Sequence, residues 1–276
     1  GAERGGLTSR ADVVIDLTGR PPLFSAPDLR EGYLRADPAD AVAVERLIRR
    51  AEGLDGTFDK PRYVAFKEDL CAHSRSRITG CTRCLDLCPA GAISPAHDHV
   101  AIDPYLCGGC GACSAACPTG AVSYAFPTTD KLIGTIRTLL TTYRAAGGTD
   151  AVLLLHDAAH GEALIDAASR FGSGLPANVL PLAVNEVTEI GLETIAVAFA
   201  YGVAHVRLLL RAKPRHEPEG LRQTMALAEP ILAALGYPAS STFALLNTLK
   251  DLGYLDYLRE DRTFVPTVRA AYEGRL

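Results

Sequence analysis

The sequence has no marked excess of charge of either sign and no hydrophobic run of membrane-spanning length. Its 276 residues hold 28 Lys and Arg against 32 Asp and Glu, and the net charge of −4 gives no drive toward nucleic acid or an anionic membrane. The most apolar stretch, residues 194–210, is short for a span and contains His205 and Arg207. No signal peptide is visible, and without a glycine-rich phosphate loop a nucleotide site is unsupported. The chain begins at Gly1 rather than methionine, so we expect a processed form or part of a longer protein.

What the sequence does contain is a cysteine-rich repeat. Residues 81–94 read CTRCLDLCPAGAIS and residues 110–123 read CGACSAACPTGAVS, at an offset of 29 residues. Cys107 completes the second copy as C-x2-C-x2-C-x3-C-P. Two-residue gaps let a tight loop wrap an iron–sulfur cubane with successive sulfurs, while the proline ends the loop and turns the last sulfur outward. A zinc ribbon would also accept paired C-x2-C units, but it does not explain the doubled C-x3-C-P.

The first copy lacks its first cysteine, because Ile78 occupies that position. The one cysteine left over is Cys71, and we infer that it replaces the missing ligand, with the following nine residues looped out. The strands predicted over 62–70 and 99–107 support this, since each leads directly into a cysteine, Cys71 or Cys107. The alternative is that Cys71 is not a ligand. The cluster that lacks this fourth cysteine would then be a three-iron species.

Residues 61–127 resemble the two-cluster 4Fe–4S ferredoxins. The resemblance implies a small fold of repeated βαβ units and two clusters that pass single electrons at low potential. In such proteins the fourth cysteine of each run crosses to the other cluster. Together with the assignment of Cys71, this implies cluster I on Cys71, Cys81, Cys84 and Cys117, and cluster II on Cys107, Cys110, Cys113 and Cys88. Thiolate ligands need reduced sulfur, so we expect a cytoplasmic location.

The rest of the chain predicts an α+β protein of several domains. Residues 11–18 suggest a buried strand, and residues 38–51 an amphipathic helix. After residue 127, helices alternate with the strands 151–156, 178–184 and 205–210, the pattern of a parallel sheet. We expect an N-terminal strand–loop–helix extension (1–60), a dicluster ferredoxin domain (61–127), a small α/β domain (128–212) and a winged-helix-like domain (213–276).

Polar residues follow the first two strands of the predicted parallel sheet, where such sheets bind ligands. They are His156, Asp157, His160, Asn185, Glu186 and Glu189. They could form a metal or acid–base constellation, or Asp157 and Asn185 could simply cap helices. Residues 150–211 resemble the delta subunit of methyl-viologen-reducing hydrogenases in the stretch NEVTEIGLETIAVAFAYGVAHVRLLL. That family uses cysteines of its own and this segment has none, which favours a docking module.

The C-terminal part predicts a helix, a turn at 236–238, a second helix over 240–252 and two short strands. Residues 221–276 thereby resemble the winged-helix domain of IclR-type bacterial regulators, with Ser240, Ser241 and Thr242 starting the recognition helix. The segment carries six basic and six acidic residues, whereas DNA-binding faces are basic. Contact with a protein is therefore a second interpretation of this domain.

These features together predict an iron–sulfur electron-transfer protein. We expect a subunit or module of a larger oxidoreductase, of the formate dehydrogenase, hydrogenase or heterodisulfide-reductase type, with a flavin, molybdenum or hydrogenase partner. No acid–base pair or nucleophile is readable, so no turnover by the chain alone is expected. The alternative is a redox- or oxygen-sensing transcriptional regulator that couples a cluster to the winged helix and binds DNA. A maturation scaffold for another iron–sulfur enzyme is a third hypothesis.

Overall fold

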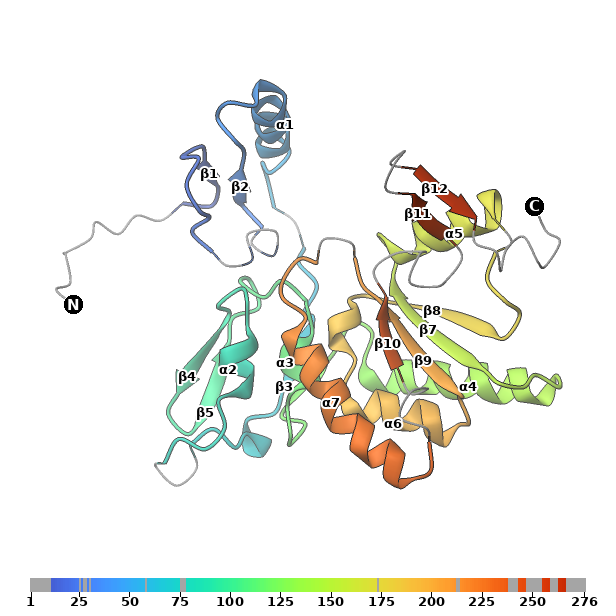
Figure 1. Cartoon of the computed structure of the whole chain (residues 1–276). Coiled ribbons are helices and arrows are strands. Elements are labelled where there is room, and N and C mark those ends of the chain that lie inside the picture. Colours follow the sequence, from blue (N-terminus) through green and yellow to red (C-terminus); the bar gives the residue numbers. More distant parts are fainter. Residues whose placement is uncertain are drawn as a thin grey trace.

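The computed structural model describes most of the chain up to residue 237 and three short strands beyond it. The described residues are 11–24, 26, 29, 31–57, 59–74, 78–172, 174–211, 214–237, 243–246, 255–258 and 263–266. Along the chain they form an N-terminal strand–helix unit, a cysteine-rich unit and a unit built on a parallel sheet (Figure 1). No helix in these ranges is long and apolar enough to cross a membrane.

The N-terminal unit is two short parallel strands followed by a helix. Its elements are β1 (Val14–Asp16), β2 (Tyr33–Arg35) and α1 (Ala41–Glu52). Asp40 caps α1, because its carboxylate accepts hydrogen bonds from the amides of Val42 and Ala43, each 3.0 Å long. The strand and helix predicted here are therefore present. The predicted burial of the strand is wrong at Val14 and Ile15, which are exposed because a two-stranded sheet covers little of its own surface.

The cysteine-rich unit repeats a strand–helix–strand order. Its elements are β3 (Val64–Phe66), α2 (Arg83–Leu87), β4 (Ile93–Ala96), β5 (His99–Ile102), α3 (Ala112–Ala115) and β6 (Val122–Tyr124). β3 pairs with β6 and β4 pairs with β5, both antiparallel, and α2 packs against α3. This is the arrangement that the ferredoxin resemblance implies. The two predicted strands before cysteines are confirmed, but each ends early, and a 3-10 turn, η2 (Glu68–Leu70), leads into Cys71.

The third unit is a four-stranded parallel sheet with its crossover helices. Its elements are α4 (Thr129–Ala145), β7 (Val152–Asp157), α5 (Gly161–Phe171), β8 (Val179–Val184), the 3-10 turn η3 (Val187–Glu189), α6 (Leu192–Ala200), β9 (His205–Leu209), α7 (Glu219–Ala234) and β10 (Phe243–Leu246). The strand order is β10–β9–β7–β8, and all neighbours are parallel. The helices and strands predicted between residues 128 and 210 are confirmed within a few residues of their bounds.

Helices cover both faces of this sheet. α4, α6 and α7 share one core, in which Leu153 of β7, Ile136 of α4 and Phe199 of α6 are each at most 2% exposed. On the opposite face Leu154 packs against Leu164 of α5. Because each central strand sends alternate side chains to both cores, the run of apolar residues in β7 is that of a fully buried strand.

The helix predicted over 240–252 is wrong at Phe243–Leu246, which form β10 beside β9. A short apolar run such as FALL is compatible with either a buried strand or a helix. Here it forms a strand because it pairs with the edge of β9 that would otherwise be open. The two short strands predicted after it are present as β11 (Leu255–Leu258) and β12 (Thr263–Pro266), an antiparallel pair. Ser240, Ser241 and Thr242 lie outside the described residues. Where a winged helix would place its recognition helix, the described residues hold a strand.

Candidate iron–sulfur site

The eight cysteines divide into two groups of four. Cys71, Cys81, Cys84 and Cys117 line one small cavity, although they come from the end of η2, the start of α2 and the loop after α3. Burial is the main cause of the raised pKa of Cys84, and its neighbours Cys81, Cys117 and Cys71 each raise it further. The apolar side chain of Val100 closes the same cavity. The structure thus brings Cys71 to the three cysteines with which the sequence grouped it.

The second group is Cys88, Cys107, Cys110 and Cys113. Buried Cys113 interacts electrostatically with Cys110, Cys107 and Cys88, and more weakly with Cys84 of the first group. In each run the fourth cysteine, Cys88 or Cys117, therefore lies with the other run, as crossed ligation requires. Apolar side chains of the N-terminal unit and of the loop after α2 cover this group: Ala26, Leu29, Ala90 and Ala92.

The chemistry of both groups fits iron–sulfur binding. A 4Fe–4S cube takes one sulfur at each of four corners, so its ligands lie farther apart than those of a single ion. Among the described residues no three His, Cys, Asp or Glu side chains are arranged to hold a single metal ion. Burial raises the pKa of Cys84 to about 11 and that of Cys110 to about 12, so these thiols carry protons at neutral pH until a metal displaces them.

Backbone amides point at the sulfurs. The amide of Ala92 donates to Cys88 Sγ at 3.3 Å, and that of Val122 to Cys117 Sγ at 3.4 Å. At Cys117 burial raises the pKa, but amide hydrogen bonds from Val122 and Thr119 outweigh it, and the pKa is lowered overall. Such bonds favour the negative charge on a ligating sulfur and are one means of tuning a cluster.

One segment of the chain matches a known family model. Residues 77–121 match the family model of the 4Fe-4S dicluster domain. The matched residues include seven of the eight cysteines, and Cys71 lies before them. No curated protein and no solved structure matches the chain. The resemblances of 150–211 to the hydrogenase delta subunit and of 221–276 to IclR-type regulators therefore stay predictions.

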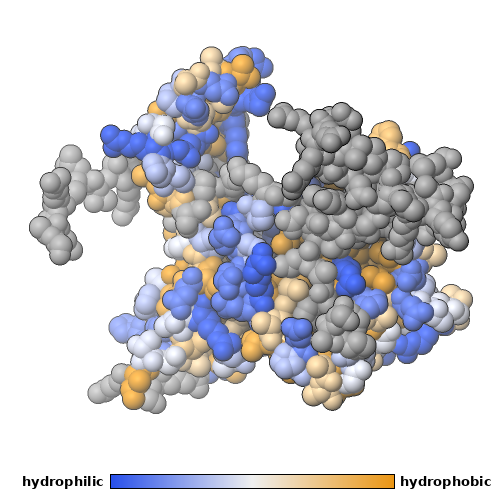
Figure 2. Space-filling model, in the orientation of Figure 1, coloured by the Kyte–Doolittle hydropathy of each residue, from blue (hydrophilic) through white to orange (hydrophobic). Residues whose placement is uncertain are grey.

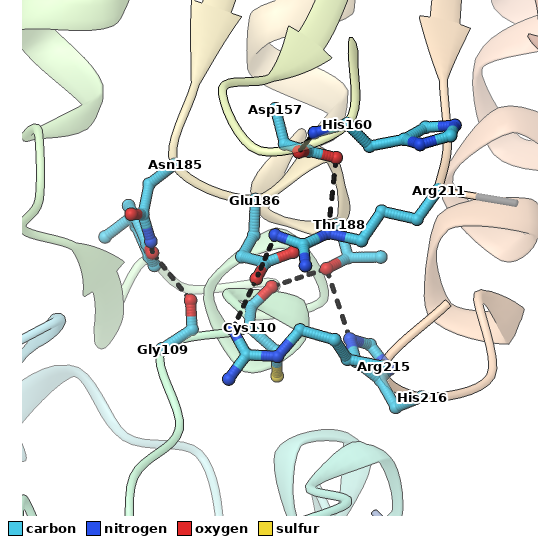
Figure 3. A network of polar contacts seen from close by, with 11 residues as sticks. Gly109, Cys110, Asp157, His160, Asn185, Glu186, Thr188, Arg211, Arg215 and His216 are labelled. Carbon is cyan, nitrogen blue, oxygen red and sulfur yellow. Dashed lines mark hydrogen bonds and ion pairs between the residues drawn. The ribbon is translucent and has the colours of Figure 1, made fainter. Parts of the chain in front are cut away.

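The sheet unit holds the second cysteine loop of the dicluster domain from one side (Figure 3). Thr188 of η3 donates a hydrogen bond from its hydroxyl to the Cys110 carbonyl at 2.6 Å. Tyr124 donates to the Gly109 carbonyl at 2.6 Å and accepts from the Asn185 amide at 2.5 Å. The loop carrying Cys107, Cys110 and Cys113 is thus fixed by Tyr124 of β6 and by Asn185 and Thr188, which follow β8.

Glu189 lies deeper in the same contact. It packs on Gly111, where any side chain would collide with it, and its two carboxylate oxygens are buried without a hydrogen-bond partner. The Tyr124 hydroxyl lies beside it, but its hydrogen goes to the Gly109 carbonyl. Burial, reinforced by the charge of Glu186, raises the pKa of Glu189 to about 8. The carboxyl group is therefore mostly protonated and neutral at pH 7.

Two of the other predicted polar residues, Asp157 and Glu186, form ion pairs, whereas the ring of buried His156 lies 3.1 Å from the Asp157 carbonyl. Arg211 lies 3.3 Å from Asp157 and 3.7 Å from Glu186, and Arg215 lies 2.7 Å from Glu186 (Figure 3). Asp157 also accepts a hydrogen bond from the amide of His160 at 2.7 Å, just before α5. The N-cap residue of α5 is His160, so Asp157 is not the cap of this helix. Arginine neutralises both carboxylates, so the arrangement suits a fixed contact better than acid–base chemistry.

Sequence reasoning found Asn185, Glu186 and Glu189 and left open a ligand constellation or helix capping, and it missed Thr188, Tyr124 and the two arginines. Thr188 and Cys110 are 78 residues apart, so no local pattern links them. The signal that could have found the arginines is the basic stretch RAKPR directly after the third strand.

Proposed function

We propose that this chain carries two 4Fe–4S clusters and transfers single electrons within a larger oxidoreductase complex. The dicluster domain supports an iron–sulfur electron-transfer role. The observation that carries the proposal of two four-iron clusters is the division of the eight cysteines into two groups of four, with Cys71 in the first. We further propose a complex of the formate dehydrogenase, hydrogenase or heterodisulfide-reductase type.

The residues divide the work as follows. Cys71, Cys81, Cys84 and Cys117 would hold cluster I, and Cys88, Cys107, Cys110 and Cys113 cluster II. When bound, each cluster accepts and returns one electron. Apolar side chains pack against Cys88, Cys107 and Cys110 of the second group and reduce its contact with water. Thr188 and Tyr124 keep the loop between its cysteines in place through the carbonyls of Cys110 and Gly109.

Counting iron and acid-labile sulfide after anaerobic reconstitution tests the clusters. We expect about eight of each per chain, and two interacting S = 1/2 centres in the EPR spectrum of the dithionite-reduced protein. About seven irons with a three-iron signal in the oxidised protein would keep electron transfer but remove Cys71 from the ligands. A reconstituted protein without iron would end the proposal.

Anaerobic affinity purification of the tagged chain from its native cells tests the complex. We expect it to co-purify with a subunit that carries flavin, molybdenum or a hydrogenase metal centre, identified by mass spectrometry and metal analysis. Purification of the chain alone, with full iron content, would argue against membership of such a complex while leaving the clusters unaffected.

A further inference from the structure

A large groove lies where the three units of the described chain meet. Its volume is about 1240 Å³, more than a cofactor of nucleotide size requires. Its walls are β2 with the residues after it, the end of α2 with Cys88 and Pro89, and the segment from the end of β9 into the first turn of α7. In Figure 2 the N-terminal unit stands as a lobe above the rest of the molecule, and the surface below it, over the start of α7, is largely hydrophilic.

The groove adjoins the end of the parallel sheet where ligands bind in α/β folds, and Leu210 just after β9 lines it. β7 is followed by β8 on one side and β9 is followed by β10 on the other, so the chain leaves their carboxyl ends in opposite directions. Such a switch point opens a crevice between the two strands. Here the crevice holds the ion pair of Asp157 and Arg211, and a smaller pocket around it shares Arg215 and His216 with the groove.

Two arginines at the groove have no ionic partner among the described residues. Arg50 in the last turn of α1 and Arg222 in the first turn of α7 are exposed, and no hydrogen bond or ion pair joins either guanidinium to another described residue. The 16-residue α7 begins after Pro218, and Gly220 and Leu221 of its first turn are buried, so the groove is left with side chains rather than helix amides to bind an anion. Guanidinium groups favour a phosphate group.

The groove also carries carboxylates, at Asp37, Asp86, Glu217 and Glu219. A bare anion would be repelled by them. A nucleotide has both kinds of group, because its phosphate binds cations while its hydroxyls and ring N–H groups donate to carboxylates. The mixed lining therefore fits a nucleotide better than inorganic phosphate, and the phosphate would be held by arginines in place of a glycine-rich loop.

Cys88 and Pro89 on the wall connect the groove to electron transfer. Cys88 belongs to the second cysteine group, so a ligand in the groove lies against a residue that would hold cluster II. Among nucleotide cofactors, flavins exchange single electrons as clusters do, whereas nicotinamides carry hydride. We propose that this groove is a binding site for a flavin nucleotide, in which Arg50 and Arg222 supply positive charge for its phosphate. The choice of flavin rests on the proposed electron-transfer function.

Titration of the anaerobically reconstituted full chain tests the proposal. FMN and FAD are followed by flavin fluorescence, and ADP and inorganic phosphate by calorimetry. We expect a flavin to bind, Arg222→Glu and Arg50→Glu each to weaken it by about tenfold or more, and Arg170→Glu on the outer face of α5 to leave it unchanged. Arg170 is matched in type and exposure, and its partner Asp166 lies on its own helix.

Each of the other outcomes contradicts a specific part of the proposal. If neither flavin binds at millimolar concentration, the groove is not a flavin site. If both groove variants bind as the unaltered protein does, any binding lies elsewhere. If ADP binds as tightly as FMN, the site recognises nucleotides and the flavin assignment falls. Iron counts on the same samples separate the two proposals, since full iron without flavin binding removes only the groove, and flavin binding without iron removes only the clusters.

Discussion

At the scale of single residues, Cys71 decides how much iron the chain can hold. It lies ten positions before Cys81 and outside the matched residues 77–121, yet it lines the same cavity as Cys81, Cys84 and Cys117. We expect Cys71→Ser to remove one cluster and leave about half of the iron, because three thiolates cannot complete a four-iron site. Iron and sulfide analysis with EPR measures this.

Cys110→Ser is the matched comparison, since it removes one thiolate from the other group. We expect it to leave the same fraction of iron with a different EPR signal. A Cys71→Ser protein with full iron content would show that Cys71 is not a ligand.

Glu189 gives the molecule a pH dependence of its own. Its pKa is about 8 in the folded protein, because of burial, against about 4.3 for an unfolded glutamate. Between these values the folded state keeps a proton that the unfolded state has lost. The stabilising contribution of the neutral form is therefore complete below about pH 4 and is lost as the pH rises to 8, by up to about 1.4 kcal/mol per pH unit.

Glu189→Gln tests this, because the amide keeps the shape and stays neutral. We expect the difference in unfolding free energy between the variant and the unaltered protein to grow in favour of the variant from pH 5 to 8. Denaturant melts of both proteins at several pH values measure it. Parallel pH profiles would show that Glu189 does not titrate in this range.

At the scale of elements, the second cysteine loop packs closely against η3 because Gly111 has no side chain. Gly111 has a φ of 75° and lies against Glu189, whereas Gly120 has a φ of 68° with open space around it. An alanine at either position meets the strain of left-handed backbone, about 1–2 kcal/mol. Only at Gly111 does it also push η3 away. We expect Gly111→Ala to shorten the half-life of the bound clusters well beyond the effect of Gly120→Ala, as followed by visible absorbance. Equal half-lives would mean that the contact with η3 does not support the site.

Local sequence patterns were sufficient for most elements and insufficient for the contacts between them. The cysteine spacing and the strand periodicity each depend on neighbouring residues, so β3, β5 and the helices and strands from α4 to β9 could be predicted. Phe243–Leu246 could not, because the open edge of β9, far away in sequence, makes it a strand. The same holds for Thr188 and Tyr124, whose partners are the carbonyls of Cys110 and Gly109. A backbone carbonyl has no sequence signature.

At the scale of the whole molecule, the two larger units differ in what stabilises them. The sheet unit has a core of aliphatic and aromatic side chains from α4, α6, α7 and the strands, and none of its members is a cysteine. The core of the dicluster domain includes Cys71, Cys84 and Cys113 among its buried side chains. We therefore expect the sheet unit to be stable without metal and the dicluster domain to depend on what its cysteines bind. The segment η3 is in contact with both units, because it packs on α3 of the dicluster domain and on α7 and β7 of the sheet unit.

Removal of iron should separate these two behaviours. We expect hydrogen–deuterium exchange of the chelator-treated protein to rise throughout residues 61–127 and in η3. In η3 the reason is that the Cys110 carbonyl, which accepts the hydrogen bond of Thr188, is no longer held in place. The amides of β7 should remain protected, since Leu153 and Leu155 are buried by helices rather than by cysteines. Comparison with the reconstituted protein at the same pH is the control. If β7 exchanged as fast as β3, the two units would unfold together, and the clusters would stabilise the whole described chain through η3.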